Sequence, residues 1–191
     1  MSELQAFADE SFREEDGGGF YVLAAAVLPT HRHVELRTEM LKLRVARPGK
    51  LHWHEMDQAE KGDVAKRVAD FDEMQFVAVG TPVPARCQER GRALCMHRLV
   101  TELHAAGVER LTAEARTVQL DGRDVRTVQQ ARHSLPKGAR FRIDHARGVD
   151  EPLLWVPDVV AGAVRAKLQG NGAFFEPLAG CVVELYVETR T

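Results

Sequence analysis

The sequence predicts an α/β fold, with a mixed β-sheet and helices packed against it. The first observation behind this prediction is a pair of strand-like segments joined by a glycine-rich turn. The second is the regular alternation of strand-like and helix-like segments that follows. A hairpin pairs its strands antiparallel, whereas strand–helix–strand alternation favours parallel pairing, so one sheet should contain both. The length of 191 residues suits a single domain, residues 1–191.

The predicted hairpin consists of LQAFADES, residues 4–11, and FYVLAAAVLP, residues 20–29. The second segment is apolar along its whole length, which is typical of a central strand that helices cover on both faces. EEDGGG, which lies between the two segments, has the composition of a turn. The second strand is therefore expected in the middle of the sheet.

Helices are expected next, because apolar residues recur at three- and four-residue intervals. ARPGK separates the first helix from LHWHEM, residues 51–56, which is expected to be a short strand or an extended segment. QFVAVGTPVP is expected to be a strand that two prolines close. The helices expected in this half cover residues 34–45, 58–74 and 86–106.

The second half of the chain repeats the alternation. Strands are expected at ERLTAEART, ARFRIDHAR and CVVELYVET, and the last of these would lie at a sheet edge open to pairing. A helix over residues 123–135 would turn Val125, Val128, Ala131 and Leu135 inward. EPLLWVPDVVAGAVRAKL predicts an unusually apolar helix, which should therefore be buried.

The composition sets limits on cellular location. Apolar residues make up 45% of the chain, yet the longest apolar run, YVLAAAVL, is far shorter than the roughly 18 residues of a membrane span. The first residues lack the basic and apolar regions of a signal peptide. Three cysteines occur without CxxC spacing. We therefore expect a cytoplasmic protein with reduced thiols and no membrane partner.

The charges are unevenly distributed along the chain. The net charge is only −2, but residues 86–147 carry 13 Lys and Arg against 7 Asp and Glu. This basic middle, between two acidic ends, suits a surface that faces phosphate groups. The alternative is a set of arginine-rich helix faces that contact only solvent.

Acidic side chains interrupt several segments that otherwise have the pattern of buried elements. Asp9 and Glu10 end the first strand, Glu114 lies within LTAEART, and Asp158 is the one charge within PLLWVPDVVAGAV. A buried carboxylate without a partner costs several kcal/mol or more. Each of these acids therefore needs water, a basic partner or a metal ion.

Asp158 has two structural explanations that need no metal. Pro157 would be the first residue of the helix, with Asp158 favoured by the helix dipole. Alternatively, Asp158 would pair with an arginine. If the helix instead begins at Pro152, then Pro157 would kink it.

Two of these segments resemble a known family. The DES triplet that starts at Asp9, and DVVAGA, which starts at Asp158, are similar to markers of domain of unknown function 3800, a large family of mostly uncharacterised bacterial proteins. That family looks like a branch of the ribonuclease H-like superfamily, and the resemblance spans nearly the whole chain. The sequence differs at Phe12, where the family commonly has Gly, and at Pro157, where it commonly has Ala.

The resemblance implies a ribonuclease H-like sheet on which three carboxylates meet. The central first strand would supply Asp9, a parallel neighbour Glu114, and the late helix Asp158. Such sites bind Mg²⁺ or Mn²⁺ through carboxylate oxygens, and two ions about 3.5–4 Å apart hydrolyse phosphodiesters. Glu10 follows Asp9 on a strand, so it would point to the opposite face. We therefore expect a divalent-metal-dependent nuclease or a related phosphodiester hydrolase.

The HWHE motif contributes two further candidates. Glu55 would join the acidic cluster as a catalytic residue, and His54 would contact the substrate. One alternative is a zinc pair formed by His52 and His54, although no distant Cys or His cluster completes it. The other is an edge strand with two surface histidines.

The basic middle of the chain contributes the candidates for nucleic-acid binding. Arg116, Arg123 and Arg126 would lie near the carboxylates and meet phosphate groups. DGRD is expected to be a turn and helix start, with Asp121 or Asp124 as the cap.

A second hypothesis is a non-catalytic module of the same fold, which binds a protein or nucleic acid and keeps its acids for structure. The low aromatic content of 6% argues against a dedicated platform for stacking single strands. The sequence leaves open whether the substrate is RNA, DNA or a hybrid, and it leaves the oligomeric state open.

Overall fold

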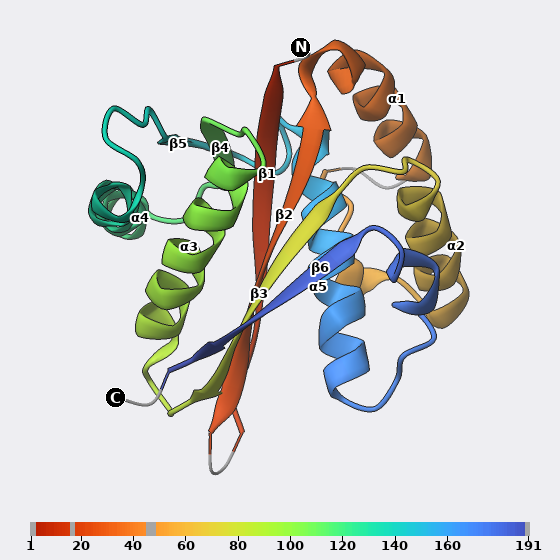
Figure 1. The fold of residues 1–191 in the computed structure, drawn as a ribbon. Coiled ribbons are helices and arrows are strands. Elements are labelled where there is room, and N and C mark those ends of the chain that lie inside the picture. Colours follow the sequence, from red (N-terminus) through yellow and green to blue (C-terminus); the bar gives the residue numbers. More distant parts are fainter. Residues whose placement is uncertain (1–2, 16–17, 45–48, 190–191) are drawn as a thin grey trace.

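The computed structural model describes residues 3–15, 18–44 and 49–189, and within them it forms a six-stranded mixed sheet (Figure 1). The strand order across the sheet is β5-β4-β1-β2-β3-β6. In chain order, the strands are β1 (Leu4–Arg13), β2 (Gly19–Pro29), β3 (Gln75–Val83), β4 (Arg110–Glu114), β5 (Arg142–Ala146) and β6 (Val182–Glu188).

The N-terminal hairpin forms the centre of this sheet. β1 and β2 pair antiparallel along their whole length, and β3 continues the antiparallel pairing beside β2. β4 is parallel to β1, β5 to β4, and β6 to β3. The predicted α/β class and mixed sheet are therefore confirmed, and β6 lies at an edge as expected.

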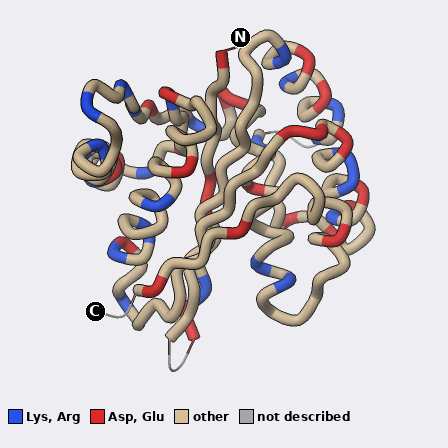
Figure 2. The backbone as a smooth tube through the Cα atoms, in the orientation of Figure 1, with Lys and Arg blue, Asp and Glu red and all other residues tan. Residues whose placement is uncertain are grey.

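Helices cover both faces of the sheet (Figure 1). α3 and α4 lie on one face, and α1, α2 and α5 lie on the other. Figure 2 shows that charged residues are concentrated on the helices and turns, while the middle of the sheet is largely uncharged. The helices are α1 (His33–Leu43), α2 (Gln58–Ala69), α3 (Gln88–Ala105), α4 (Val118–Ala131) and α5 (Trp155–Leu168).

Each face of the sheet has its own hydrophobic core, and this explains the apolar run of β2. Ten of the eleven residues of β2 are buried, because alternate side chains enter the two cores. β1 alternates in the same way. Phe7 belongs to the core under α5, and Ala8 belongs to the core under α3. Asp9 therefore faces α5, and Glu10 faces the opposite side.

β1 is longer than predicted, so Asp9 and Glu10 lie inside the strand and do not end it. The strand continues to Arg13 because β2 pairs with all of it. On its other side, the parallel pairing with β4 ends at Ala8 and Ala113. The two acids therefore follow directly after the point where β1 and β4 separate.

Two other segments also differ from the predictions. LHWHEM contains no strand, and Trp53–Glu55 form a single 3-10 turn. α4 begins at Val118, five residues earlier than expected, because the Thr117 side chain accepts a hydrogen bond from the Leu120 N–H and caps the helix. Asp121 and Asp124 are consequently inside α4, and the prediction that one of them caps it is wrong.

The same shift in α4 changes which side chains face the core. Asp124, Val128 and Ala131 are buried, whereas Val125 is 36% exposed. The inward orientation predicted for Val125 is therefore wrong. Leu135, beyond the helix, is partly buried against the same core, as predicted.

The apolar segment near the C-terminus begins as a 3-10 turn, Pro152–Leu154, and continues as α5. Pro157 is the third residue of α5, where its missing N–H leaves no hydrogen bond of the helix interior unmade. Asp158 lies in the first turn of α5, as the helix-dipole alternative expected, but Pro157 is not the first residue of the helix as that alternative proposed. In the part of the chain that the structure describes, no helix combines the length and apolarity that crossing a membrane requires.

Candidate functional site

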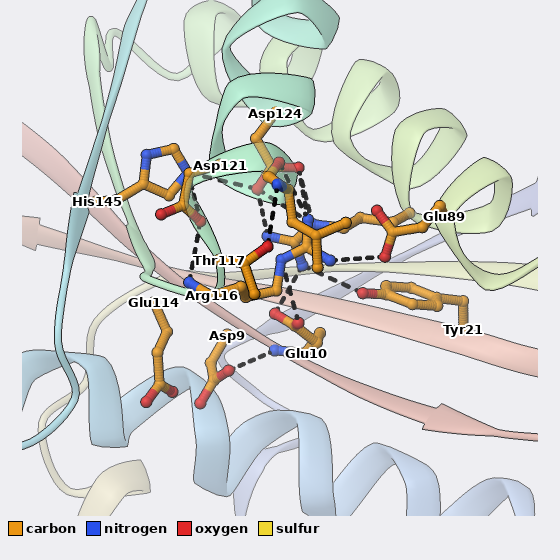
Figure 3. Close-up of polar contacts among 12 residues, drawn as sticks. Asp9, Glu10, Tyr21, Glu89, Glu114, Arg116, Thr117, Asp121, Asp124 and His145 are labelled. Carbon is orange, nitrogen blue, oxygen red and sulfur yellow. Dashed lines mark hydrogen bonds and ion pairs between the residues drawn. The ribbon is translucent and has the colours of Figure 1, made fainter.

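The three carboxylates that the sequence singled out gather on one face of the sheet. Asp9 comes from β1, Glu114 is the last residue of β4, and Asp158 is on α5, which packs over β1. Figure 3 shows the Asp9 and Glu114 side chains next to each other above α5. Asp9 is only 6% exposed. We call Asp9, Glu114 and Asp158 the acidic cluster.

A lysine that sequence reasoning missed lies within the acidic cluster. The Lys50 ammonium is 2.7 Å from Asp9 Oδ2, and it also donates to Glu114 Oε2. Lys50 is 8% exposed, so the contact is shielded from solvent. One ammonium thus neutralises part of the charge of three carboxylates.

The Asp158 side chain is held by the backbone of the segment that also carries Lys50. Its Oδ2 accepts a hydrogen bond from the Trp53 N–H at 3.1 Å. The Trp53 ring in turn covers Gly162, one turn further along α5, where an added Cβ would lie 2.3 Å from the ring. Residue 162 must therefore be glycine for this segment to pack against α5 and reach Asp158.

The pKa shifts within the acidic cluster reflect burial first, and then the charges of the neighbouring carboxylates and of Lys50. Burial raises the pKa of Asp9 well above its usual range, and Asp158 and Glu114 raise it further, against the opposing effect of Lys50. Burial likewise raises the pKa of Asp158, although Lys50 and the Trp53 N–H oppose it. Burial would also raise the pKa of Glu114, but a hydrogen bond with Asp9 and the contact with Lys50 outweigh it and leave that pKa below its usual value. An added cation would therefore relieve the repulsion.

The HWHE motif lies only partly at the acidic cluster. His52 is close enough that its positive form lowers the pKa of Glu114 and Asp158. His54 and Glu55 point outward, with side chains 75% and 54% exposed and 3.9 Å between Nε2 and Oε1. Glu55 therefore lies at the surface, and its predicted membership of the cluster stays a prediction.

The two histidines of this motif lie side by side, with ring centroids 5.2 Å apart. Within the described ranges, no third His, Cys, Asp or Glu lies close enough to both to complete a metal site. The zinc alternative therefore has no complete ligand set in this part of the chain.

A second polar cluster occupies the opposite face of the sheet, between β1, α3 and α4 (Figure 3). Its centre is Arg92, which is 1% exposed and donates to Asp124 at 2.9 and 2.7 Å and to the Tyr21 hydroxyl at 3.1 Å. Arg92 is also 2.6 Å from Glu10. We call this group the arginine cluster, and Glu10 belongs to it, as expected from its position next to Asp9.

The arginine cluster contains the closest group of possible metal ligands in the described part of the chain. Ligand atoms of Asp121, Asp124 and His145 all lie within 4.8 Å of one another. However, Arg92 and Arg116 both donate to Asp124, and the second does so at 3.1 Å. Burial would raise the pKa of Asp124, but His145 and the arginines lower it strongly. The charge of Asp124 is thus already neutralised, and a divalent cation would meet two guanidinium groups.

The arginines predicted to lie near the carboxylates are on the wrong face of the sheet. Arg116 pairs with Glu89 at 2.7 Å and with Asp124, so its guanidinium is committed to the arginine cluster. Arg123 and Arg126 line a hollow between α3 and α4. The basic middle of the chain therefore does not surround the acidic cluster.

Of the comparisons with known proteins, the one with solved structures gave a match. No family model matches the chain, and no curated protein matches its sequence. Among solved structures, the chain is similar to ribonuclease HII of Archaeoglobus fulgidus, determined in complex with PCNA. The TM-score is 0.50 at 11% sequence identity, over 94% of this chain and 77% of that one. A likeness at this identity concerns the fold, and together with the strand order it shows that the chain has a ribonuclease H-like fold.

Proposed function

We propose that this protein is a divalent-metal-dependent nuclease or a related phosphodiester hydrolase. The observation that carries the proposal is the acidic cluster, in which carboxylates from β1, β4 and α5 meet where β1 and β4 separate. The similar solved structure is itself a ribonuclease by name, which supports nucleic acid as the substrate class.

The residues of the acidic cluster fit Mg²⁺ or Mn²⁺. Their donors are all carboxylate oxygens, which these hard cations prefer. Burial, more than the neighbouring carboxylates, raises the pKa values of Asp9 and Asp158, and a bound cation would favour their charged forms. When bound, such ions activate a water and stabilise the leaving oxygen of a phosphodiester.

Lys50 has two roles in this proposal. It holds Asp9 and Glu114 in position, and its ammonium would attract the phosphate of a substrate to the cluster. The same contacts favour the second candidate function, a non-catalytic module, because Lys50 alone already neutralises part of the cluster. Metal binding decides between these two candidates.

Family membership and the roles of Glu55 and His54 are also part of the proposal. The DES and DVVAGA segments each contribute one acid, Asp9 and Asp158, to the acidic cluster, and membership of domain of unknown function 3800 is part of the proposal although no family model matches the chain. Glu55 and His54 are exposed beside the cluster, and we retain them only as residues that would contact substrate from outside.

The test measures thermal unfolding with and without metal. We expect MgCl₂ or MnCl₂ to raise the melting temperature, because a ligand at 100 times its Kd stabilises the folded state by about 2.7 kcal/mol. Asp158→Asn should abolish most of this rise and leave the metal-free protein as stable or more stable, since repulsion falls. Asp70→Asn, at the exposed end of α2, is the matched control and should keep the rise.

Lys50→Met distinguishes the two candidate functions. A nuclease site should be destabilised by this change in EDTA and recover in metal, because the ions replace the lost positive charge. A purely structural cluster should be destabilised equally in both. Release of labelled fragments from RNA, DNA and hybrid oligonucleotides then measures activity. The absence of any metal effect on the wild-type protein would refute the proposal.

A further inference from the structure

A hollow beside the acidic cluster is lined by basic and neutral polar side chains. It has a volume of about 320 Å³ and lies between the 3-10 turn Trp53–Glu55, α2 and the C-terminal half of α5. None of the described residues that line it is acidic. We call it the Trp53 hollow, and its polar lining includes His54, Lys61, Arg165, Gln169 and Asn171.

Trp53 connects this hollow directly to the acidic cluster. Its backbone N–H donates to Asp158, and its ring forms part of the wall of the hollow. Gly162 and Arg165 also line the hollow, one and two turns beyond Asp158 on α5. A chain of phosphates that passes over Asp158 would therefore reach the Trp53 hollow next.

The lysine and the arginine of the hollow, Lys61 and Arg165, are not neutralised by the described residues. The Lys61 ammonium lies 5.7 Å from the centre of the Trp53 ring, and Arg165 donates one hydrogen bond, to Ser11 Oγ at 3.3 Å. Neither forms an ion pair with any described residue. The last turn of α5 is basic and carries Arg165. Free cations in a concave site without carboxylates attract an anion.

We propose that the Trp53 hollow binds backbone phosphates of a polynucleotide strand, next to the phosphate held at the acidic cluster. The second part of this inference, that the hollow is a subsite next to the acidic cluster for the same substrate, rests on the proposed function. It implies that the substrate is a polymer, since a mononucleotide would leave the hollow empty.

The hollow recognises phosphate and not bases. The Trp53 ring packs on Gly162, meets Phe174 edge to face at 5.4 Å between centroids, and has Lys61 nearby. The ring is therefore already in contact with protein groups and is a poor stacking platform for a base. Phosphate contacts carry no sequence information, so binding should depend little on base sequence.

The test measures the binding of short fluorescein-labelled oligonucleotides by anisotropy in EDTA, where hydrolysis does not occur. The probes are single-stranded DNA, single-stranded RNA and an RNA–DNA hybrid. We expect Lys61→Gln/Arg165→Gln to weaken binding of the preferred probe about 25-fold at 0.1 M salt. Each lost phosphate contact with a single strand lowers the slope of log K against log salt by about 0.7, so two contacts change K by about 25-fold for each tenfold change in salt. Lys61→Arg/Arg165→Lys should keep most of the affinity, since both charges remain.

The matched control is Arg123→Gln/Arg126→Gln, which removes the same charge from the hollow on the opposite face. This control should bind almost as tightly as the wild type. Equal losses in the two double-glutamine variants, or no binding of any probe by the wild type, would overturn the inference.

A comparison with Asp158→Asn separates this inference from the proposed function. Lys61→Gln/Arg165→Gln should lose oligonucleotide binding and keep the metal-induced rise in melting temperature. Asp158→Asn should do the reverse. If the wild type shows no metal effect but its binding still depends on Lys61 and Arg165, the nuclease proposal fails while the polynucleotide site stands.

Discussion

Replacement of Asp124 should reveal whether the arginine cluster is a structural ion-pair network. Asp124 is 3% exposed, and Arg92 donates to it at 2.9 and 2.7 Å. Asp124→Asn keeps the shape of the side chain but removes the charge between Arg92 and Arg116. We expect a large loss of stability, because the guanidinium of Arg92 stays buried with only Glu10 to pair with it.

The size of this loss follows from the burial of the pair. Breaking a buried ion pair by changing one partner costs about 3–5 kcal/mol. Glu10 remains 2.6 Å from Arg92, so the lower end, about 3 kcal/mol, applies. For a chain of this length, each kcal/mol lowers the melting temperature by about 2–4 °C, which gives a decrease of roughly 6–12 °C.

Thermal and urea unfolding of three variants tests this reasoning. Asp121→Asn is the control. Asp121 is less buried than Asp124, accepts the Arg116 backbone N–H and lies 3.9 Å from His145 Nε2, so its replacement should cost under about 1 kcal/mol. Arg92→Met/Asp124→Leu should lose less than Asp124→Asn alone, since the buried guanidinium is removed together with its partner and Glu10 keeps Arg116 at 4.0 Å. A loss in Asp124→Asn no larger than in Asp121→Asn would refute the reasoning. So would a metal-induced rise in melting temperature that Asp124→Asn abolishes, because it would assign the metal to this face.

Two further predictions concern the acid limit of stability and the support of the acidic cluster. The pKa of Asp124 is depressed in the folded protein, so its contribution to stability is present above its unfolded pKa of about 3.9 and is lost as pH falls below that value. Between neutral pH and about pH 2, the free energy of unfolding measured in urea should therefore depend less on pH for Asp124→Asn than for the wild type. Gly162→Ala should cost about 1–3 kcal/mol and weaken the metal-induced rise in melting temperature, because its Cβ displaces Trp53 and with it the N–H that holds Asp158. Gly122→Ala, whose Cβ meets nothing within 4 Å, should leave both quantities unchanged or slightly improved, and equal effects of the two alanines would count against this link.

The sheet can be predicted because its strands carry local signals. The apolar run of β2 and the alternation of β1 depend only on neighbouring residues, and the predicted bounds of both agree with the structure to within two residues. The predicted start of α4 is too late because DGRD has the composition of a turn, whereas Thr117 supplies a cap just before the true start. The 3-10 turn at Trp53 carries no periodic signal at all, and the strand alternative for this segment is therefore wrong.

The acidic cluster is only half predictable from the sequence. Asp9 and Asp158 interrupt apolar segments, and that local contrast distinguishes them from the other acids of the chain. Lys50 gives no such signal, because it follows a Pro-Gly pair and lies 41 and 64 positions away from its two carboxylate partners. A lysine in such a setting normally faces solvent, and only the tertiary fold brings this one to Asp9. The predicted placement of Arg116, Arg123 and Arg126 beside the carboxylates is wrong for the same reason, since composition gives the charge of a segment but not the face of the sheet on which it lies.

The two adjacent acids of β1 differ in how well nearby cations balance their charges. Glu10 faces Arg92 and Arg116, so its charge is balanced by cations that the chain itself supplies. Asp9 faces one lysine that it shares with two other carboxylates. Burial raises its pKa most and the two carboxylates raise it further, and the single ammonium does not offset these effects. A fold selected only for stability has no reason to leave one face balanced and the other with excess negative charge, one residue apart. The imbalance on the Asp9 face is therefore the feature that calls for a ligand, and a divalent cation is the ligand that its oxygen donors and its charge both favour.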